Sequence, residues 1–131
     1  MKIDHIAIAT RGLDDATAVW KNALGLEAES TEEVAEQGVR VAMLPVGDAH
    51  IELLEPLTPD SPISKFLEKR GPGLHHVAVR VKDISAALDQ LKAKGTRLID
   101  EAPRQGARGC LVAFIHPSAT NGVLLELVQH Q

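Results

Sequence analysis

Two histidines and two glutamates occupy matching places in the two halves of this chain. His5 stands 47 residues before Glu52, and His76 stands 50 residues before Glu126. Each of the four lies in a short run with the alternating pattern of a β-strand. Two imidazoles and two carboxylates form a borderline donor set that suits Co, Mn, Ni, Fe or Zn and leaves room for two further ligands. We therefore predict one metal site whose ligands are His5, Glu52, His76 and Glu126.

The neighbours of these residues indicate a shared polar face. A lone strand histidine is usually structural and a lone strand glutamate is usually solvated, so the prediction depends on the repetition. Side chains alternate between the faces of a strand. This alternation places aliphatic residues opposite each histidine or glutamate: Ile6 and Ile8, Ile51 and Leu53, Val77 and Val79, and Val123, Leu125 and Leu127. Helices would cover the aliphatic faces, and the polar faces would curl around a cavity.

The strands and helices that must position these residues also occur in two copies along the chain. The stretches IDHIAIATRGLDDATAVW and LHHVAVRVKDISAALDQL both begin with an alternating strand and continue into an amphipathic helix. Each half ends with two strand-like runs, VRVAMLPV and HIELLEP in the first, CLVAFIHP and VLLELVQ in the second. One more strand is expected in the acidic stretch 27–34. We predict an α+β fold of two tandem βαβββ modules that form a curved mixed β-sheet around a metal-binding cavity.

Helix signals agree with the repeat. Each helix has one apolar stripe: Leu13, Ala16, Trp20 and Leu24 in the first, and Ile84, Ala87, Leu88 and Leu91 in the second. Asp83 is a suitable N-cap for the second helix. Gly25 and Gly95 stand where a glycine cap at the C-terminal end belongs.

A connection rich in proline and glycine, EPLTPDSPISKFLEKRGPG, joins the halves. Within it, Ser61 can cap a short helix that has Pro62 at its first position. Three apolar residues give that helix one stripe: Ile63, Phe66 and Leu67. We predict a single domain over residues 1–131, with module one about 1–56, a linker helix about 57–72 and module two about 73–131.

Composition excludes several classes of protein. The net charge is -4 and only three residues are aromatic, so the chain lacks the clustered cations and stacking rings of a nucleic-acid-binding protein. Cys110 is the only cysteine, which excludes an internal disulfide and a cysteine-rich zinc site. We interpret it as a small, buried strand residue. No apolar stretch approaches the ~20 residues of a membrane span. The first residues show no leader pattern, and we predict a cytoplasmic protein that binds no membrane.

The other histidines have weaker claims on the metal site. His50 shares the face of Glu52 one pleat away, and His75 shares the aliphatic face of its strand. His116 is expected to form a hydrogen bond at a strand end, and His130 is expected to be solvated. Three glutamates are interpreted as an exposed acidic face: Glu32, Glu33 and Glu36.

The paired modules with their four metal-site residues resemble the vicinal-oxygen-chelate superfamily, which includes glyoxalases, extradiol dioxygenases, antibiotic-resistance proteins and methylmalonyl-CoA epimerases. The resemblance covers nearly the whole chain, and seven motifs resemble the epimerases: EQGV, ELLEPL, DSPISKFL, GPGLHHVAVRV, GARG, FIHP and GVLLELVQ. The resemblance implies a divalent metal bound by His5, Glu52, His76 and Glu126. Cobalt is the first candidate, with manganese, nickel or zinc as alternatives. The resemblance also implies an acyl-CoA substrate and a homodimer.

The resemblance implies a reaction as well, the interconversion of the C2 epimers of methylmalonyl-CoA through a metal-stabilised enolate. Reprotonation from the opposite face requires two acid–base groups beside C2. Glu126 is the first candidate, as both ligand and base, and Glu52 is the second. Some epimerases of this family have a glutamate base where Val41 stands here and a glutamine where Glu52 stands. This difference favours a Glu52–Glu126 pair, as in glyoxalase-type isomerases.

Other activities stay open. A lactoylglutathione lyase uses the same ligand types, although DSPISKFL and GLHHVAV favour the epimerase. An extradiol dioxygenase uses two histidines and one carboxylate, so the fourth ligand and the absence of tyrosine argue against it. A non-catalytic ligand-binding member would not need four metal ligands. The GARG loop could close over a substrate carboxylate or form a simple turn. Four cations are available to phosphate groups but are interpreted as surface charges: Lys21, Lys65, Arg104 and Arg108.

Overall fold

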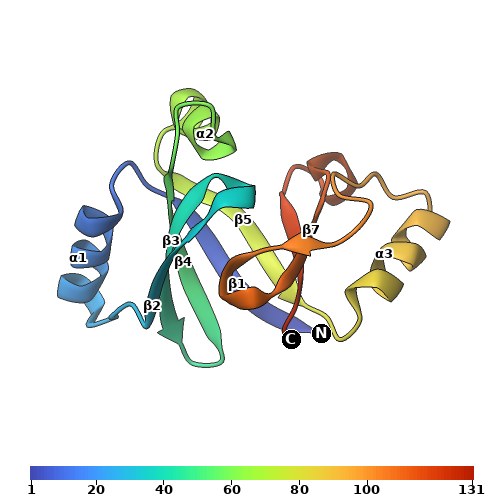
Figure 1. Cartoon of the computed structure of the whole chain (residues 1–131), viewed down its shortest axis with the longest axis horizontal. Helices are drawn as coiled ribbons and strands as arrows, with labels where there is room; N and C mark the ends of the chain where they lie inside the picture. The colour runs from blue at the N-terminus through green and yellow to red at the C-terminus, as the bar shows by residue number, and fades with distance from the viewer. The chain divides into compact units, whose positions relative to one another are not determined.

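A computed structural model describes residues 1–131, which divide into two compact units. One unit comprises His5–His75, and the other comprises Met1–Asp4 together with His76–Gln131. Each half of the chain has the element order βαβββ, and a linker helix lies between the halves in sequence (Figure 1). The predicted α+β class and the tandem modules are therefore confirmed. No helix combines the length and the apolar character needed to cross a membrane.

The unit His5–His75 contains a four-stranded mixed sheet in the order β2-β3-β4-β1. Its elements are the greater part of β1 (Lys2–Ala9), whose first three residues belong to the other unit, and then α1 (Leu13–Leu24), β2 (Ser30–Val34), the 3-10 turn η1 (Ala35–Gln37), β3 (Val39–Val46), β4 (Ala49–Pro56) and the linker helix α2 (Pro62–Arg70). Strands β1 and β4 are parallel, whereas β3 pairs antiparallel with both β2 and β4. Strand β2 confirms the strand expected in the acidic stretch.

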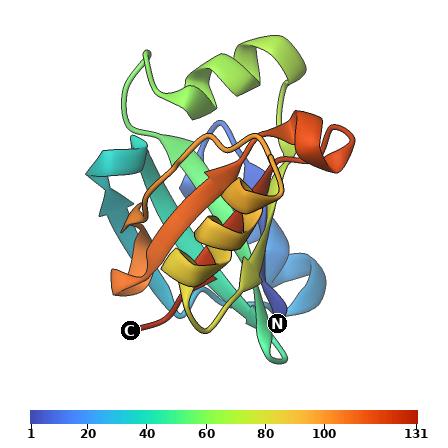
Figure 2. The ribbon, with the colours of Figure 1, turned by 90° about the vertical axis from the view of Figure 1, so that its right-hand side faces the viewer.

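The second unit repeats this arrangement in the order β5-β8-β7-β6. Its elements are the greater part of β5 (Gly73–Arg80), whose first three residues belong to the unit His5–His75, and then α3 (Ile84–Ala93), β6 (Arg104–Gln105), the turn η2 (Ala107–Gly109), β7 (Leu111–Ile115), the turn η3 (Pro117–Thr120) and β8 (Leu125–Gln129). Strands β5 and β8 are parallel, and β7 pairs antiparallel with β6 and β8. Figure 2 shows α3, drawn in yellow, lying across the strands of its own unit.

Each unit has an aliphatic core between its helix and one face of its sheet. In the first, Leu13 of α1 packs with Leu44 of β3 and Leu53 of β4, and Ala16 and Trp20 lie against this cluster. In the second, the core contains Ile84, Leu88, Ala113, Ile115 and Leu127, with Ala87 and Leu91 packed against it. The predicted stripe of α3 is thus confirmed in full, and apolar burial holds each helix on its sheet.

Two expected core residues lie outside these clusters. Leu24 is 66% exposed because it is the last residue of α1, just before Gly25 ends the helix in a left-handed conformation with φ of 71°. Val123 is 49% exposed because β8 begins only at Leu125. At the end of α1 and the start of β8, the apolar period predicts one buried position too many. The backbone changes direction there, so the side chain no longer faces the core.

Corresponding side chains also hold the beginnings of the two core helices. Glu55 Oε1 accepts a hydrogen bond from the N–H of Leu13 at 3.1 Å, and Gln129 Oε1 accepts one from the N–H of Ile84 at 2.8 Å. Glu55 and Gln129 each stand three residues after a predicted metal ligand. Asp83 also caps α3, as predicted, by accepting from the N–H of Ala86. The strand that carries each glutamate is therefore tied to the helix of its own module.

The linker helix has the predicted signals. Ser61 Oγ accepts a hydrogen bond from the N–H of Ile63 at 3.2 Å, and Pro62 is the first helical residue. Ile63 and Leu67 are buried. Phe66 is partly buried, and its ring meets the ring of His75 edge-on at 4.9 Å. The stripe of α2 thus packs within its own unit, which confirms a folded helix rather than a plain tether.

Candidate metal centre

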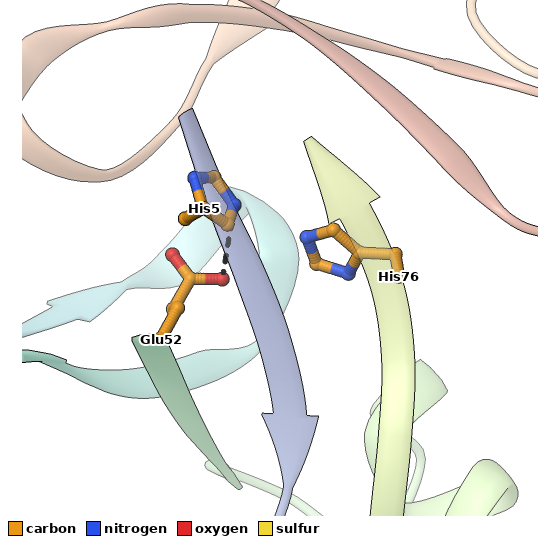
Figure 3. A group of neighbouring side chains, drawn as sticks. All are labelled: His5, Glu52 and His76. Atoms are coloured by element: carbon orange, nitrogen blue, oxygen red, sulfur yellow. Dashed lines mark ion pairs between the residues drawn. The ribbon is translucent and has the colours of Figure 1, made fainter. Parts of the chain in front are cut away.

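The first half of the candidate centre is a His–Glu contact between neighbouring strands. His5 projects from β1 and Glu52 from β4, with 3.5 Å between His5 Nε2 and Glu52 Oε1 (Figure 3). The parallel register sets Glu52 beside Ala7, two residues after His5. The two side chains are therefore diagonal neighbours on one face of the sheet. Both residues are no more than 5% exposed, so the pair lies in a region of low dielectric constant.

The second half repeats this geometry in the other unit. His76 on β5 and Glu126 on β8 have 3.5 Å between Nε2 and Oε1. Here the register sets Glu126 beside Ala78, again two residues after the histidine. Both side chains are buried. The two His–Glu pairs therefore match in strand register and in the distance between their atoms, as well as in their sequence spacing.

Apolar side chains surround each pair on its own sheet. Glu52 has the fully buried Met43 as its cross-strand neighbour on β3. Glu126 has Phe114 as its neighbour on β7, and the Phe114 ring meets the His76 ring edge-on with centroids 5.2 Å apart. The guanidinium carbon of Arg104 lies 5.6 Å from the Phe114 ring centroid. These walls restrict the rotamers of the histidine and the glutamate and keep water from their flanks.

The chemistry of each pair fits a divalent metal ion. Two donors that each bind one ion at about 2.1 Å are separated by roughly 3 Å, close to the 3.5 Å found in both pairs. A buried carboxylate needs a compensating charge or hydrogen bonds, which a neutral imidazole supplies only in part. Imidazole and carboxylate together are ligands of zinc, cobalt, nickel and manganese. Each half therefore has the donors and the spacing of half a metal site.

Val41 stands where the resemblance implies a glutamate base in some epimerases. Val41 is buried on β3 and lies beside Leu54 of β4 and Glu32 of β2. An aliphatic side chain therefore fills this place, as the sequence indicated. Glu33 and Glu36 are exposed, as predicted, whereas Glu32 is only partly exposed.

Two further histidines and the single cysteine lie outside the two His–Glu pairs. His50 Nε2 is 2.5 Å from an oxygen of Glu29. His116 caps the turn η3 by accepting from the N–H of Ser118, which confirms the hydrogen bond expected at a strand end. Cys110 is buried with Ala78, Val112 and Val128, as expected, but it lies just before β7 and is therefore not a strand residue. Burial raises the pKa of the Cys110 thiol, so the thiol stays protonated at neutral pH.

A buried aspartate beside the first histidine was not predicted. Asp4 is fully buried and contacts three cationic or titratable side chains of its own unit. Arg80 Nη2 lies 3.0 Å and His130 Nε2 2.6 Å from Asp4 Oδ1, and Arg108 Nη2 lies 3.1 Å from Oδ2. His130 is exposed, as expected, and also contacts Asp4, whereas the interpretation of Arg108 as an ordinary surface charge was wrong. The only sequence signal was an acidic residue inside the strand, next to His5.

Two βαβββ modules, each with a buried His–Glu pair on one sheet face, define a class of α+β protein with a candidate metal site. The sequence profile of the Glyoxalase/Bleomycin resistance protein/Dioxygenase superfamily matches residues 4–114, and the chain belongs to this superfamily. It is 42% identical over 130 residues to the ethylmalonyl-CoA/methylmalonyl-CoA epimerase of Cereibacter sphaeroides, covering 98% of this chain and 97% of that one.

Solved structures agree with the sequence relatives. The crystal structure of methylmalonyl-CoA epimerase from Mycobacterium tuberculosis has a TM-score of 0.96 at 40% identity, covering 99% of this chain and 88% of that chain. A methylmalonyl-CoA epimerase in complex with methylmalonyl-CoA and NH4+ has a TM-score of 0.93 at 40% identity, covering 98% and 93%. The resemblance to the epimerases therefore extends over the whole chain.

Proposed function

We propose that this protein is a metal-dependent isomerase that interconverts the C2 epimers of methylmalonyl-CoA. The observation that carries the proposal is the repeated His–Glu pair, which has the same register offset and the same 3.5 Å separation in each unit. Relatives named for this activity match the whole chain at about 40% identity, which supports the choice of substrate.

The metal site combines both pairs. His5 and Glu52 supply two ligands, and His76 and Glu126 supply the other two. The donor set leaves two coordination positions for the substrate, which offers a thioester oxygen and a carboxylate oxygen. Co2+ is the first candidate, and Mn2+, Ni2+ or Zn2+ suit the same donors.

The reaction removes and returns the proton on C2. When bound, the metal acts as a Lewis acid that stabilises negative charge on the thioester oxygen. Glu126 takes the C2 proton from one face, and Glu52 serves the opposite face. The apolar walls formed by Met43 and Phe114 keep water from the flanks of the carboxylates, which strengthens the interaction of each carboxylate with the C2 proton.

Replacing His76 by alanine tests the metal site. We expect His76→Ala to lose metal and activity together, while far-UV circular dichroism shows an unchanged fold. Addition of Co2+ should raise the unfolding temperature of the wild type, because a ligand at 100 times its Kd stabilises by about 2.7 kcal/mol. The variant should show a much smaller shift. Full metal occupancy in His76→Ala would remove His76 from the site.

Two substrates test the reaction. Metal-loaded protein is incubated in heavy water with methylmalonyl-CoA, and separately with the methylglyoxal–glutathione adduct. We expect deuterium at C2 of methylmalonyl-CoA and no turnover of the adduct. Turnover of the adduct alone would replace the epimerase by a lactoylglutathione lyase. Binding of either compound without turnover would indicate a non-catalytic member of the superfamily.

Assembly and location also belong to the proposal. We propose a homodimer, because members of this superfamily of similar size commonly pair, and a cytoplasmic location. Light scattering at micromolar concentration measures the first of these. A monomeric mass would contradict it.

A further inference from the structure

The apolar wall beside the second His–Glu pair is itself held by two charged residues. Phe114 on β7 has Glu126 as its cross-strand neighbour, and its ring meets the His76 ring edge-on with 5.2 Å between centroids. Asp100, which precedes β6, and Arg104, which begins it, both contact Phe114. All five residues belong to the same unit. The ring that limits the rotamers of the histidine and the glutamate is therefore in contact with a charged pair.

Asp100 fixes the backbone of Phe114. Its Oδ2 atom accepts a hydrogen bond from the Phe114 N–H at 2.8 Å. The Phe114 carbonyl in turn accepts from the N–H groups of Ile99 and Asp100, at 3.0 and 3.1 Å. Three hydrogen bonds thus tie one residue of β7 to the segment before β6, and they satisfy both of its main-chain polar groups.

Arg104 holds the ring of Phe114. The β6–β7 register sets Arg104 beside Val112, two residues before Phe114, so Arg104 and Phe114 are diagonal neighbours on one sheet face. The Arg104 guanidinium carbon lies 5.6 Å from the ring centroid, and Arg104 Nε lies 3.3 Å from Asp100 Oδ1. A guanidinium paired with a carboxylate has a fixed orientation and stacks well on an aromatic ring. The Arg104 side chain is 35% exposed, so its removal takes away this support without opening a cavity in the core.

The first unit has a different wall at the equivalent position. Met43 on β3 stands beside Glu52, and its carbonyl accepts a hydrogen bond from the Glu29 N–H at 2.8 Å. Glu29 thus takes the place of Asp100, but its carboxylate lies 2.5 Å from His50 Nε2. A methionine side chain also has three rotatable bonds and adapts its shape easily. The two modules therefore match in their His–Glu pairs but differ in the side chain that borders the glutamate and in the contacts that hold it.

We propose that Asp100 and Arg104 are positioning residues that hold His76 and Glu126, through Phe114, in the geometry that binds the metal. This role rests on the proposed function. Groups that orient metal ligands restrict the ligand rotamers before the ion arrives, so less conformational freedom is lost on binding. The second His–Glu pair is then the preformed half of the site, and the first pair, bordered by a flexible methionine, is the half that adapts.

Metal affinity of Arg104 variants tests this role without reference to turnover. The Kd of Co2+ is measured by competition with a chelator, and the visible absorption of bound Co2+ reports the ligand geometry. We expect Arg104→Ala to alter the spectrum and to raise the Kd about 3- to 10-fold, less than the roughly 10- to 100-fold caused by loss of a group that contacts a ligand directly. Arg104→Lys, which keeps the charge, should recover part of the affinity. The control Arg97→Ala removes an exposed arginine of the same segment and should bind Co2+ like the wild type.

The direction of the change separates positioning from charge. A cation near a metal site repels the ion, so Arg104→Ala would lower the Kd of Co2+ if Arg104 acted only through its charge. A double-mutant cycle with Phe114→Leu shows the route, because Arg104→Ala should weaken Co2+ binding by less than about 2-fold once the ring is absent. An unchanged or lower Kd in Arg104→Ala, or full additivity in the cycle, overturns the proposal. If Arg104→Ala weakens Co2+ binding as expected but the metal-loaded wild type does not epimerise methylmalonyl-CoA, the positioning role stands and the proposed function fails.

Discussion

Replacement of Asp4 by asparagine should cost this protein a large part of its stability. The side chain keeps its size, so packing is preserved, but the carboxylate charge disappears from a fully buried position. Arg80, Arg108 and His130 then share a neutral amide, and the two guanidinium groups repel each other across it. Breaking a buried ion pair by removing one partner is far more costly than omitting the pair altogether.

The magnitude follows from the contacts. Arg80 and Arg108 form charge-assisted hydrogen bonds to Asp4, each contributing about 1.5–3 kcal/mol. Their side chains are 29% and 20% exposed, so water restores part of the loss. The asparagine carbonyl still accepts one bond. We expect a net loss of about 3 kcal/mol, which lowers the midpoint of thermal unfolding by roughly 10 °C for a chain of this length.

Urea and thermal unfolding followed by far-UV circular dichroism measure this loss. Asp48→Asn is the matched control, because Asp48 is exposed in the turn between β3 and β4 and should shift stability by less than about 0.5 kcal/mol. Arg108→Gln should cost only about 1 kcal/mol, because Arg80 still compensates the carboxylate. If Asp4→Asn unfolds like the wild type, or if Arg108→Gln is the more costly change, the charge of Asp4 does not hold this cluster together.

Three further predictions concern helix ends, the thiol and the bases. Glu55→Ala and Gln129→Ala should each lower the free energy of unfolding by about 0.5–2 kcal/mol, since each removes the acceptor at a helix start; a loss below 0.2 kcal/mol in urea titrations would contradict this. Cys110 should resist iodoacetamide at pH 7.5 and react fully in 6 M urea, since burial and a raised pKa keep it a protonated thiol; mass spectrometry of the folded protein would reveal the contrary. Glu126→Gln should abolish epimerisation with a rate loss of about 10²–10⁴ while one epimer still exchanges its C2 proton through Glu52, and Glu52→Gln should show the opposite preference. Deuterium incorporation into each separate epimer, with metal content checked, decides the assignment, and a normal rate in Glu52→Gln would leave Glu52 as a ligand only.

Much of the fold follows from local patterns in the sequence. Alternation identified the strands of His5, Glu52, His76 and Glu126, and the 3.6-residue period identified all three helices. These signals are readable because one face of each element is buried in an aliphatic core, which imposes a period on the side chains. Ser61 and Asp83 were also found, since a capping side chain bonds to backbone only two or three residues away.

Duplication made the candidate site predictable. One histidine in a strand indicates little, but a second His–Glu pair at nearly the same spacing indicated a common use. The structure adds the register within each unit, because both glutamates lie beside the residue two positions after their histidine. Within each pair, the histidine Nε2 and the glutamate Oε1 are 3.5 Å apart. The combination of the two pairs in one metal site stays a prediction.

The tertiary structure alone decided the role of Asp4 and its partners. Arg80, Arg108 and His130 lie 76, 104 and 126 residues away from Asp4 in sequence, and no local period relates charged side chains that meet through strand pairing and loop placement. The same limit applies to Glu55 and Gln129, whose helix partners lie 42 and 45 residues away. Buried apolar residues recur at a regular period along a helix or strand, so a short stretch of sequence shows them. A specific ion pair or long-range cap instead depends on two residues that only the folded chain brings within about 3 Å of each other.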